Sequence, residues 1–192
     1  AKIGLRNPLW TKINPRIKAR LRKNRQVLSK NIDNFFGWVK GAKLVELKEC
    51  NIEEDPVRPE LDNNFRTGYG RKIYGVEYLG EIHAVMCFAY TNKVPKSVDE
   101  LEKLSTDAFL QTAMRDQSGG QIAIAYTVWS KKKGGGKLIV KEVFKKKKKS
   151  NHLNRLVTLS PLTDMATKFH ERNGAKLIQV NETTQNFEYK VL

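Results

Sequence analysis

The segment of residues 121–144 joins a strand pattern to a helix pattern through three glycines, and this junction constrains the fold more than any other part of the sequence. Residues 122–129 are β-branched, aromatic or small and carry no charge, which is typical of a buried strand. From Lys137 onward, apolar residues recur four positions apart, as they do on one face of a helix. The sequence therefore predicts a strand, a glycine loop at residues 134–136 and a helix in direct succession.

A glycine loop at the start of a helix is suited to bind a phosphate group. The first helical turn has backbone N–H groups without partners, they lie at the positive end of the helix dipole, and glycine lets an anion approach the backbone closely. The spacing does not fit a Walker A motif, because Lys131 stands where its first glycine would be and Leu138 where its Ser or Thr would be. It does not fit the dinucleotide fingerprint either, because Ile139 occupies the position of the third glycine.

The loop resembles the pyrophosphate loop of the GNAT acyltransferase superfamily. That pattern is Gln or Arg, two residues, Gly, one residue, then Gly or Ala, and here Lys131 takes the first position before Gly134 and Gly136. The resemblance implies that the loop faces the pyrophosphate of acetyl-CoA or another acyl-CoA, with no metal involved. The residues expected to contact the acyl-CoA are Thr127, Val128, Trp129, Lys131, Lys132, Lys133, Gly134, Gly135, Gly136 and Lys137.

The order of the segments around the loop is also similar to that of the superfamily. Two candidate strands, residues 71–79 and 81–91, precede it as a hairpin, and a short apolar run at 153–159, a helix near Pro161 and a last strand near 187–191 follow it. A first strand is expected at residues 43–48 and a helix from Ser97. The resemblance implies an α/β (α+β) fold, a mixed and mostly antiparallel sheet flanked by helices.

Two further motifs resemble the catalytic domain of malonyl-CoA decarboxylase, a GNAT-fold enzyme. They contain Ser160, in Thr-Leu-Ser-Pro, and His170, in Phe-His followed by Asn-Gly-Ala, and the resemblance implies that both residues are catalytic. In that family a long insertion separates the motifs, whereas nine residues separate Ser160 from His170 here. If residues 161–170 were all helical, the two side chains would stand roughly 13–15 Å apart. They would meet only if the helix began late, near residue 163, with Ser160 folded back.

Each of these two residues also has a purely structural interpretation. Ser followed by Pro161 is a common helix start, and a histidine one turn before a C-terminal Asn-Gly is often only exposed. For acyl transfer to an amine, His170 is the best candidate acid, because its ordinary pKa near 6.5 allows either protonation state at neutral pH. Glu77 is a candidate general base, with Glu81 as an alternative. The resemblance to the GNAT superfamily implies that the backbone of residues 127–129 polarises the thioester carbonyl.

The positive charge of the chain is concentrated in two segments. The net charge is +16, and residues 1–30 hold ten Lys or Arg and no acid, while residues 131–149 hold ten Lys and one Glu. The remaining residues sum to about −3 (16 − 10 − 9). Residues 2–30 and 131–149 are therefore candidates to bind DNA or RNA, with a solvated lysine-rich surface as the alternative.

The composition indicates two parts and a soluble, cytoplasmic protein. Residues 1–40 are expected to form a basic N-terminal helical extension that ends near Gly37, and residues 41–192 a GNAT-like acyl-CoA-binding domain. No run approaches the roughly 18 apolar residues of a membrane span, and the basic amino end does not fit a signal peptide. Cys50 and Cys87 suit a reducing compartment, and no spacing of His and Cys predicts a metal site.

Three functions remain open on these observations. The leading one is an acyl-CoA-dependent acyltransferase that carries acetyl to an amine acceptor, which could belong to a nucleic acid. The enzymatic alternative is a malonyl-CoA decarboxylase-like enzyme. The third is a non-catalytic nucleic-acid-binding protein with a degenerate acyl-CoA site.

Overall fold

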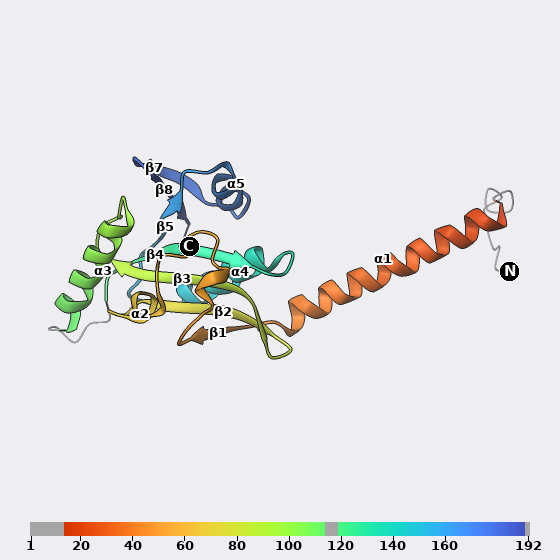
Figure 1. Ribbon diagram of the computed structural model, residues 1–192, viewed down its shortest axis with the longest axis horizontal. Coiled ribbons are helices and arrows are strands. Elements are labelled where there is room, and N and C mark those ends of the chain that lie inside the picture. The colour runs from red at the N-terminus through yellow and green to blue at the C-terminus, as the bar shows by residue number, and fades with distance from the viewer. Residues whose placement is uncertain (1–13, 114–118, 191–192) are drawn as a thin grey trace, which may run out of the picture. The chain divides into compact units, whose positions relative to one another are not determined.

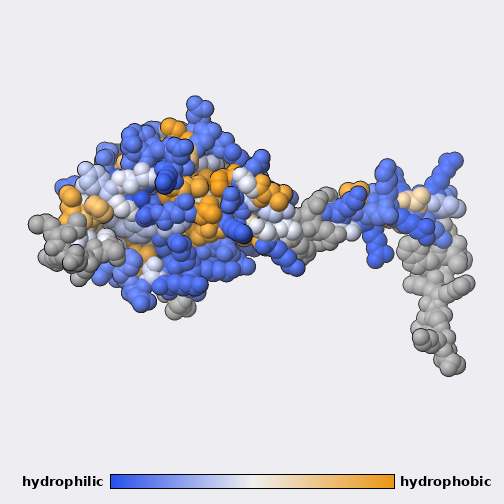
Figure 2. All heavy atoms as spheres, turned by 90° about the horizontal axis from the view of Figure 1, so that it is seen from below, coloured by the Kyte–Doolittle hydropathy of each residue, from blue (hydrophilic) through white to orange (hydrophobic). Residues whose placement is uncertain are grey.

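The structure of the protein is a computed structural model that describes residues 14–113 and 119–190, with the side chains of residues 31–36 and 113 excepted. The chain divides into two compact units, Ala1–Gly41 and Ala42–Leu192. In the first unit, helix α1 spans Pro15–Gly41 (Figure 1). The expected end at Gly37 is wrong, because a single glycine weakens a helix by only about 1 kcal/mol and does not stop it. The surface of α1 is mostly hydrophilic, with a few apolar side chains (Figure 2).

The second unit contains the sheet and the remaining helices. The strands in the described residues are β1 Lys43–Leu47, β2 Lys72–Tyr78, β3 Glu81–Thr91, β4 Ile122–Ser130, β5 Arg155–Thr158, β6 Ser160–Pro161, β7 Lys176–Val180 and β8 Thr184–Tyr189. The helices are η2 Ile52–Glu54, α2 Asn63–Thr67, α3 Val98–Ala113, α4 Gly135–Lys148 and α5 Asp164–Arg172. The expected hairpin, first strand and glycine-linked strand and helix are all confirmed, whereas α2 and β7 were not anticipated.

The strands form one mixed sheet in the order β1-β2-β3-β4-β5-β8-β6, with β7 paired to β8. All of these pairs are antiparallel except β4 with β5. The parallel pair is short, because β5 lies beside β4 only at Ile122–Ala125, while β4 continues to Ser130. In the described residues, the second half of β4 is therefore open on the side of β5.

A bulge in β4 marks the point where the two strands separate. Cys87 of β3 pairs with Thr127 and Phe88 pairs with Ala125, so Tyr126 is an extra residue on β4. Such bulges bend a strand and increase its local twist. The pairing of β4 with β5 ends at Ala125, directly before this bulge.

The helices cover opposite faces of the sheet. Successive residues of a strand point to opposite faces, and Cys87 contacts Arg66 of α2 whereas Phe88 contacts Lys147 of α4. Accordingly α4 packs against β2, β3 and β4 on one face, and α2 and α3 lie over the other (Figure 1). The main apolar cluster includes Ile73, Cys87 and Leu101, all of which are fully buried on the α2 and α3 side.

Helix α3 begins where the sequence predicts. The Ser97 hydroxyl accepts a hydrogen bond from the N–H of Glu100 at 3.1 Å, and the Glu100 carboxylate accepts one from the N–H of Lys96 at 2.6 Å. The serine cap therefore forms as expected, although the glutamate reaches one residue further back than in a standard capping box.

Helix α5 begins three residues later than the position near Pro161 that the sequence suggested. Its N-cap is Thr163, whose hydroxyl accepts a hydrogen bond from the N–H of Ala166 at 3.2 Å, and Asp164 opens the first turn. Threonine and aspartate stabilise a helix start through capping and the helix dipole. Pro161 instead lies in β6, opposite Thr184 of β8. The late start decides where Ser160 lies.

Candidate active site

The glycine loop makes a tight passage from β4 into α4. Gly134 has a φ of +82°, a backbone conformation that strains other residues, and Gly135 begins the helix. A Cβ atom on Gly135 would lie 2.1 Å from Ser130 Oγ and 3.2 Å from Ser130 Cβ, so any other residue here would displace the Ser130 side chain. Ser130 itself donates to the carbonyl of Lys132 at 2.6 Å. The three glycines therefore let the loop fold closely over the end of β4, with the first turn of α4 following directly.

The lysines of the loop have different environments. Lys131 Nζ forms an ion pair with Glu54 at 2.7 Å, and Lys132 Nζ lies 4.8 Å from the centre of the Tyr78 ring. Lys133 and Lys137 are exposed on either side of the glycines. An anion at the first turn of α4 would thus have exposed ammonium groups before and after it.

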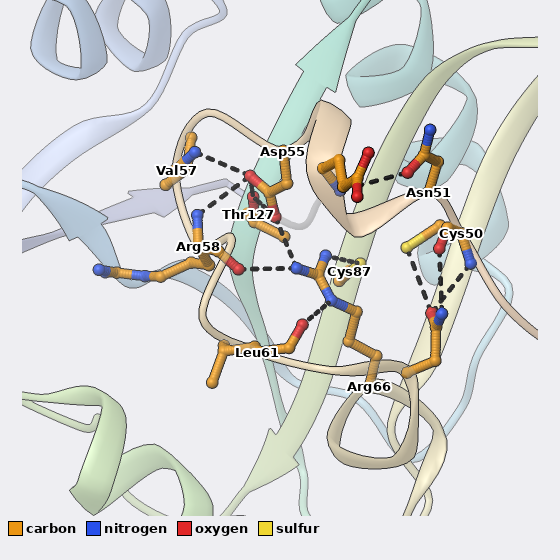
Figure 3. Close-up of polar contacts among 11 residues, drawn as sticks. Cys50, Asn51, Asp55, Val57, Arg58, Leu61, Arg66, Cys87 and Thr127 are labelled. Atoms are coloured by element: carbon orange, nitrogen blue, oxygen red, sulfur yellow. Dashed lines mark hydrogen bonds and ion pairs between the residues drawn. The ribbon is translucent and has the colours of Figure 1, made fainter.

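The expected substrate-facing segment of β4 is anchored from the opposite face by a buried ion pair. Thr127 Oγ1 donates to both carboxylate oxygens of Asp55, at 2.8 and 2.9 Å (Figure 3). The Asp55 carboxylate also accepts from the N–H groups of Val57 and Arg58 and pairs with Arg66 at 2.9 Å. Val128 is half-buried and Trp129 is buried. The segment therefore has a fixed position beside the open edge of the sheet.

Arg66 completes this anchor with no exposed atoms on its side chain. Its guanidinium donates to the carbonyl oxygens of Leu61 at 2.8 Å and Arg58 at 2.7 Å, and lies 5.6 Å from the centre of the Trp129 ring. Figure 3 shows it surrounded by the loop that leads from η2 to α2. Sequence reasoning missed this group, since residues 53–70 contain prolines, glycines and an Asp-Asn-Asn cluster, a composition typical of a loop.

Ser160 and His170 are brought into direct contact. Ser160 Oγ lies 2.9 Å from His170 Nε2, and both residues are buried. The late start of α5 produces this contact, because Ser160 stays in β6, paired with Gln185 of β8, while His170 lies near the end of the helix. Helix α5 therefore begins late enough for the side chains of Ser160 and His170 to meet.

The contact extends into a longer hydrogen-bonded chain. His170 Nδ1 lies 2.8 Å from the hydroxyl of Tyr189, and Ser160 Oγ lies 2.9 Å from Thr158 Oγ1. Thr158 Oγ1 in turn accepts from the N–H of Phe187 at 3.1 Å. Both ring nitrogens of His170 are thus held by hydroxyl groups, which fixes the orientation of the imidazole. Tyr189 and Thr158 were not anticipated as members of the site.

The surroundings of His170 keep it neutral. Its ring stacks on Phe187 at a centroid distance of 5.1 Å and meets the edge of Phe169 at 5.2 Å. Burial lowers the pKa of His170 to about 4, and burial also raises the pKa of the Tyr189 hydroxyl. The expectation that His170 exists in either protonation state at neutral pH is therefore wrong, because no carboxylate among the described residues offsets the cost of burying an imidazolium.

The loop and the Ser160–His170 pair belong to one region. A Cβ atom on Gly136 would lie 2.9 Å from the ring of Phe169, the residue before His170, and Phe144 of α4 packs on Tyr189 at 4.7 Å between ring centres. Helix α4 therefore touches the helix and the strand that carry the hydrogen-bonded chain.

Glu77 lies apart from this chain. It is half-buried on β2, opposite Ile82, and β3 separates its strand from β4. Glu81 is 79% exposed at the turn of the hairpin, 3.9 Å from His83. No hydrogen bond or ion pair joins either carboxylate to Ser160 or His170 in the described part of the chain, and the role of Glu77 as a base stays a prediction.

The low pKa of His170 gives a testable pH dependence of stability. In the unfolded chain the pKa is about 6.5, so between pH 6.5 and 4 the unfolded state binds a proton that the folded state does not. Lowering the pH through this range should cost on the order of 3 kcal/mol of folding free energy, with the loss levelling off below pH 4. Urea unfolding of the wild type and of His170→Gln at several pH values measures it. Parallel curves for the two proteins would contradict it.

The described residues contain neither a cluster of metal ligands nor a membrane-spanning helix. These residues contain no group of three or more His, Cys, Asp or Glu side chains placed to hold a metal ion. None of the helices in the described ranges has the length and apolar character that crossing a membrane requires.

Comparison with known proteins gives matches in structure alone. No family model matches the sequence, and no curated protein does. Among solved structures, the chain is similar to the GNAT-like decarboxylase GphF in complex with isobutyryl-CoA, with a TM-score of 0.61, 9% identity and coverage of 78% of this chain and 100% of that one. It is also similar to the loading GNATL domain of CurA from Lyngbya majuscula, with a TM-score of 0.55, 13% identity and coverage of 78% and 98%.

A third similar structure is malonyl-CoA decarboxylase from Agrobacterium vitis, with a TM-score of 0.52 and 15% identity. The match covers 82% of this chain but 43% of that one, so this chain spans less than half of the length of that enzyme. At these identities the likeness concerns the fold. The mixed sheet open beside β4, the glycine loop and the helix that follows it, together with these matches, show that residues 42–192 have the GNAT fold.

Proposed function

We propose that this chain is an acyl-CoA-using enzyme that decarboxylates a malonyl-type thioester. The observation that carries the proposal is the buried contact of 2.9 Å between Ser160 Oγ and His170 Nε2, in a region that also touches the glycine loop. For simple acyl transfer, a histidine near the leaving sulfur has to act as an acid. A histidine whose pKa is about 4 is a neutral imidazole at pH 7, so it can relay a proton between two hydroxyl groups but does not supply one as an imidazolium.

The reaction requires a place for negative charge and a source of one proton. When the bond between Cα and the carboxylate breaks, CO₂ leaves and the electron pair forms an enolate with the thioester carbonyl. The enolate then takes one proton at Cα, so that malonyl-CoA and a proton give acetyl-CoA and CO₂. Hydrogen-bond donors fixed before the reaction stabilise such an enolate.

The residues of the site can be assigned to these tasks. The glycine loop and the first turn of α4 bind the pyrophosphate of the substrate, and the open half of β4 at residues 126–130 receives its thioester arm. The Ser160 hydroxyl donates its proton to Cα and is reprotonated by His170 Nε2–H, while His170 Nδ1 accepts from Tyr189. Tyr189 recovers its proton from solvent. Because burial raises its pKa, Tyr189 is protonated before the reaction and has a proton to pass to His170 Nδ1.

Incubation of the full chain with malonyl-CoA and with acetyl-CoA tests this assignment. We expect release of CO₂ and formation of acetyl-CoA from malonyl-CoA without any acceptor. Appearance of free thiol only when an amine is added would instead support acyl transfer. Consumption of neither thioester would contradict both enzymatic functions.

A second candidate function is acyl transfer to an amine on a polyanion, and the surface of α4 favours it. A groove of about 540 Å³ lies between α4 and the end of α5, and its lining includes Lys137, Lys141, Lys145, Lys148 and Arg172. Lys145 pairs with Glu142 at 2.9 Å, and the others have no carboxylate within 4 Å among the described residues. Rows of lysine at this spacing suit the phosphates of DNA or RNA.

The salt dependence of nucleic-acid binding measures this second candidate. The logarithm of the affinity for a labelled duplex should fall linearly with the logarithm of the salt concentration, by nearly one unit per phosphate bound. Replacing Lys137, Lys141 and Lys148 together with glutamine should reduce this slope by about one unit for each phosphate that the variant no longer binds. The same three changes at the exposed residues Lys93, Lys103 and Lys176 form the matched control. Equal slopes for both triple variants would contradict the assignment.

A further inference from the structure

A second cavity lies at the far end of α4 from the glycine loop. It has a volume of about 680 Å³ and is lined by Tyr69, Gly70, Lys72, Tyr74, Tyr90, Phe109, Thr112, Gly119, Lys146, Lys147, Ser150, His152 and Leu153. Lys147 is twelve positions after Gly135 in α4, which corresponds to about 18 Å along the helix axis. None of these residues belongs to the glycine loop or to the chain formed by Ser160, His170 and Tyr189. The cavity is therefore separate from the proposed active site.

The most unusual residue of this cavity is Lys147, which is only 5% exposed. It lies on the face of α4 that carries Val140 and Val143, both of which are buried against the sheet. Because position 147 follows Val140 and Val143 at helical spacing, an apolar side chain is expected there. The neighbouring lysines at 145, 146, 148 and 149 are exposed and already complement the dipole at the end of the helix. The dipole therefore does not account for a lysine at position 147.

The ammonium group of Lys147 has polar and aromatic partners but no acid. It donates to the hydroxyl oxygen of Tyr74 at 3.3 Å and to that of Tyr90. It also lies 4.8 Å, 4.7 Å and 5.1 Å from the ring centres of Tyr74, Tyr90 and Phe88. Among the described residues, no carboxylate lies within 4 Å of this ammonium group. The nearby carboxylate of Glu46 pairs instead with Lys72, at 2.7 Å.

A buried cation without a counter-ion destabilises the fold. Burial, with a contribution from Lys146, lowers the pKa of the Lys147 ammonium to about 8, so the group is still mostly charged at neutral pH. Buried charges in proteins are normally paired. Among the described residues, the charged groups around it are Lys146 on the same helix, and Lys72 and Glu46, which neutralise each other. The remaining local charge is positive.

Hydrogen-bond donors at this position remain available to a ligand. The ammonium has three N–H groups, and two of them are used by the hydroxyl oxygens of Tyr74 and Tyr90. One N–H of Lys147 and one tyrosine O–H can therefore be donated to an acceptor in the cavity.

The rest of the lining is suited to a flat apolar group. Tyr69 and Phe109 meet edge to face, with ring centres 6.1 Å apart, and Leu153 adds an aliphatic surface. Aromatic rings pack well against such pairs. A single buried cation matches a single negative charge.

We propose that this cavity binds a small aromatic carboxylate, whose carboxylate pairs with Lys147 and one tyrosine hydroxyl and whose ring packs near Tyr69 and Phe109. The ligand supplies a counter-ion that Lys147 does not have among the described residues. The site is independent of the proposed decarboxylation, because none of its residues takes part in that reaction.

The probe for this site is 2-naphthoate, with 2-naphthalenemethanol as the neutral compound of the same shape. In calorimetric titrations of the full chain at pH 7, we expect naphthoate to bind at least about tenfold more tightly than the alcohol, since one charged contact in a buried site has an effect of this size. Lys147→Met, which removes the charge and keeps the length, should reduce the affinity for naphthoate at least about tenfold. Lys147→Arg should retain most of it, and Lys103→Met, an equal charge change at an exposed position of α3, should have no effect.

A second measurement does not depend on a folded variant. In the wild-type chain with ¹³C-labelled lysine, naphthoate should shift the Lys147 side-chain resonance and raise its titration midpoint above the value near pH 8, because the carboxylate stabilises the ammonium. Equal affinities for naphthoate and the alcohol, or a Lys147 resonance that naphthoate leaves unchanged, would overturn the proposal.

Discussion

Replacing Ser160 with alanine is expected to lower kcat for CO₂ release from malonyl-CoA by on the order of 10²–10⁴, because the variant loses the hydroxyl that delivers the proton. His170→Asn should have a loss of similar size, since the shorter side chain cannot bridge Ser160 and Tyr189. The Kd for coenzyme A should change little in both variants, because the glycine loop is intact. Steady-state kinetics, together with calorimetric titration of coenzyme A, separate these two effects.

Three further variants make this prediction decisive. The double variant should be no slower than the slower single variant, since the two residues act as one unit. Tyr189→Phe removes the hydroxyl at His170 Nδ1, so it should lower kcat and also shift the pH profile, whereas a purely structural role would leave the profile unchanged. Ser29→Ala, at an exposed position of α1, is the control for loss of a hydroxyl. If Ser160→Ala kept wild-type kcat, the proposed mechanism would be wrong.

The sequence was most informative where short-range patterns decide the structure. The hairpin of β2 and β3 turns at Leu79 and Gly80, which have φ values of +52° and +80°, and the glycine at this position marks the turn. The strand, glycine loop and helix around Gly134 follow from the change in apolar spacing and the glycine triplet. Such features depend on neighbours along the chain, and so they can be predicted without knowledge of the fold.

The contact between Ser160 and His170 depended on a local choice that the sequence left open. Two helix starts compete, Ser160 followed by proline and Thr163 followed by aspartate, and both are favourable caps. Pairing of β6 with Gln185 of β8 holds Ser160 in a strand and leaves Thr163 as the cap. Tertiary contacts therefore decided between two equally good local signals.

The burial of Lys147 was not recognised in a run of five lysines. All five residues are lysines with lysine neighbours, so only their angular positions around the axis of α4 distinguish them. Extending the apolar spacing of Val140 and Val143 by one helical turn would have placed Lys147 on the buried face. The polar group around Asp55 was harder to predict, because Asp55 and Thr127 are 72 residues apart in sequence.

The largest effect on stability is expected from breaking the ion pair between Asp55 and Arg66. Both side chains have no exposed surface, and the Asp55 carboxylate holds Arg66, Thr127 and two backbone N–H groups at once (Figure 3). Asp55→Asn keeps the shape of the side chain but leaves the guanidinium of Arg66 buried without a counter-ion. Loss of one partner of such a pair lowers the free energy of unfolding by about 3–5 kcal/mol. Urea unfolding followed by tryptophan fluorescence measures this change.

The double variant Asp55→Asn with Arg66→Met distinguishes the cost of an unpaired charge from a general loss of packing. Because it removes both charges, it should be more stable than Asp55→Asn alone, and the coupling energy from the four proteins should be on the order of 2–3 kcal/mol. Lys72→Met provides the comparison with an exposed pair, since its partner Glu46 is 47% exposed and such pairs contribute about 0–1 kcal/mol. If the double variant were as unstable as the sum of the single changes, the charge of Arg66 would not be what Asp55 neutralises. In that case Asp55 would stabilise the fold mainly through its bonds to Thr127 and the backbone, and the position of β4 beside the open edge would depend on those bonds alone.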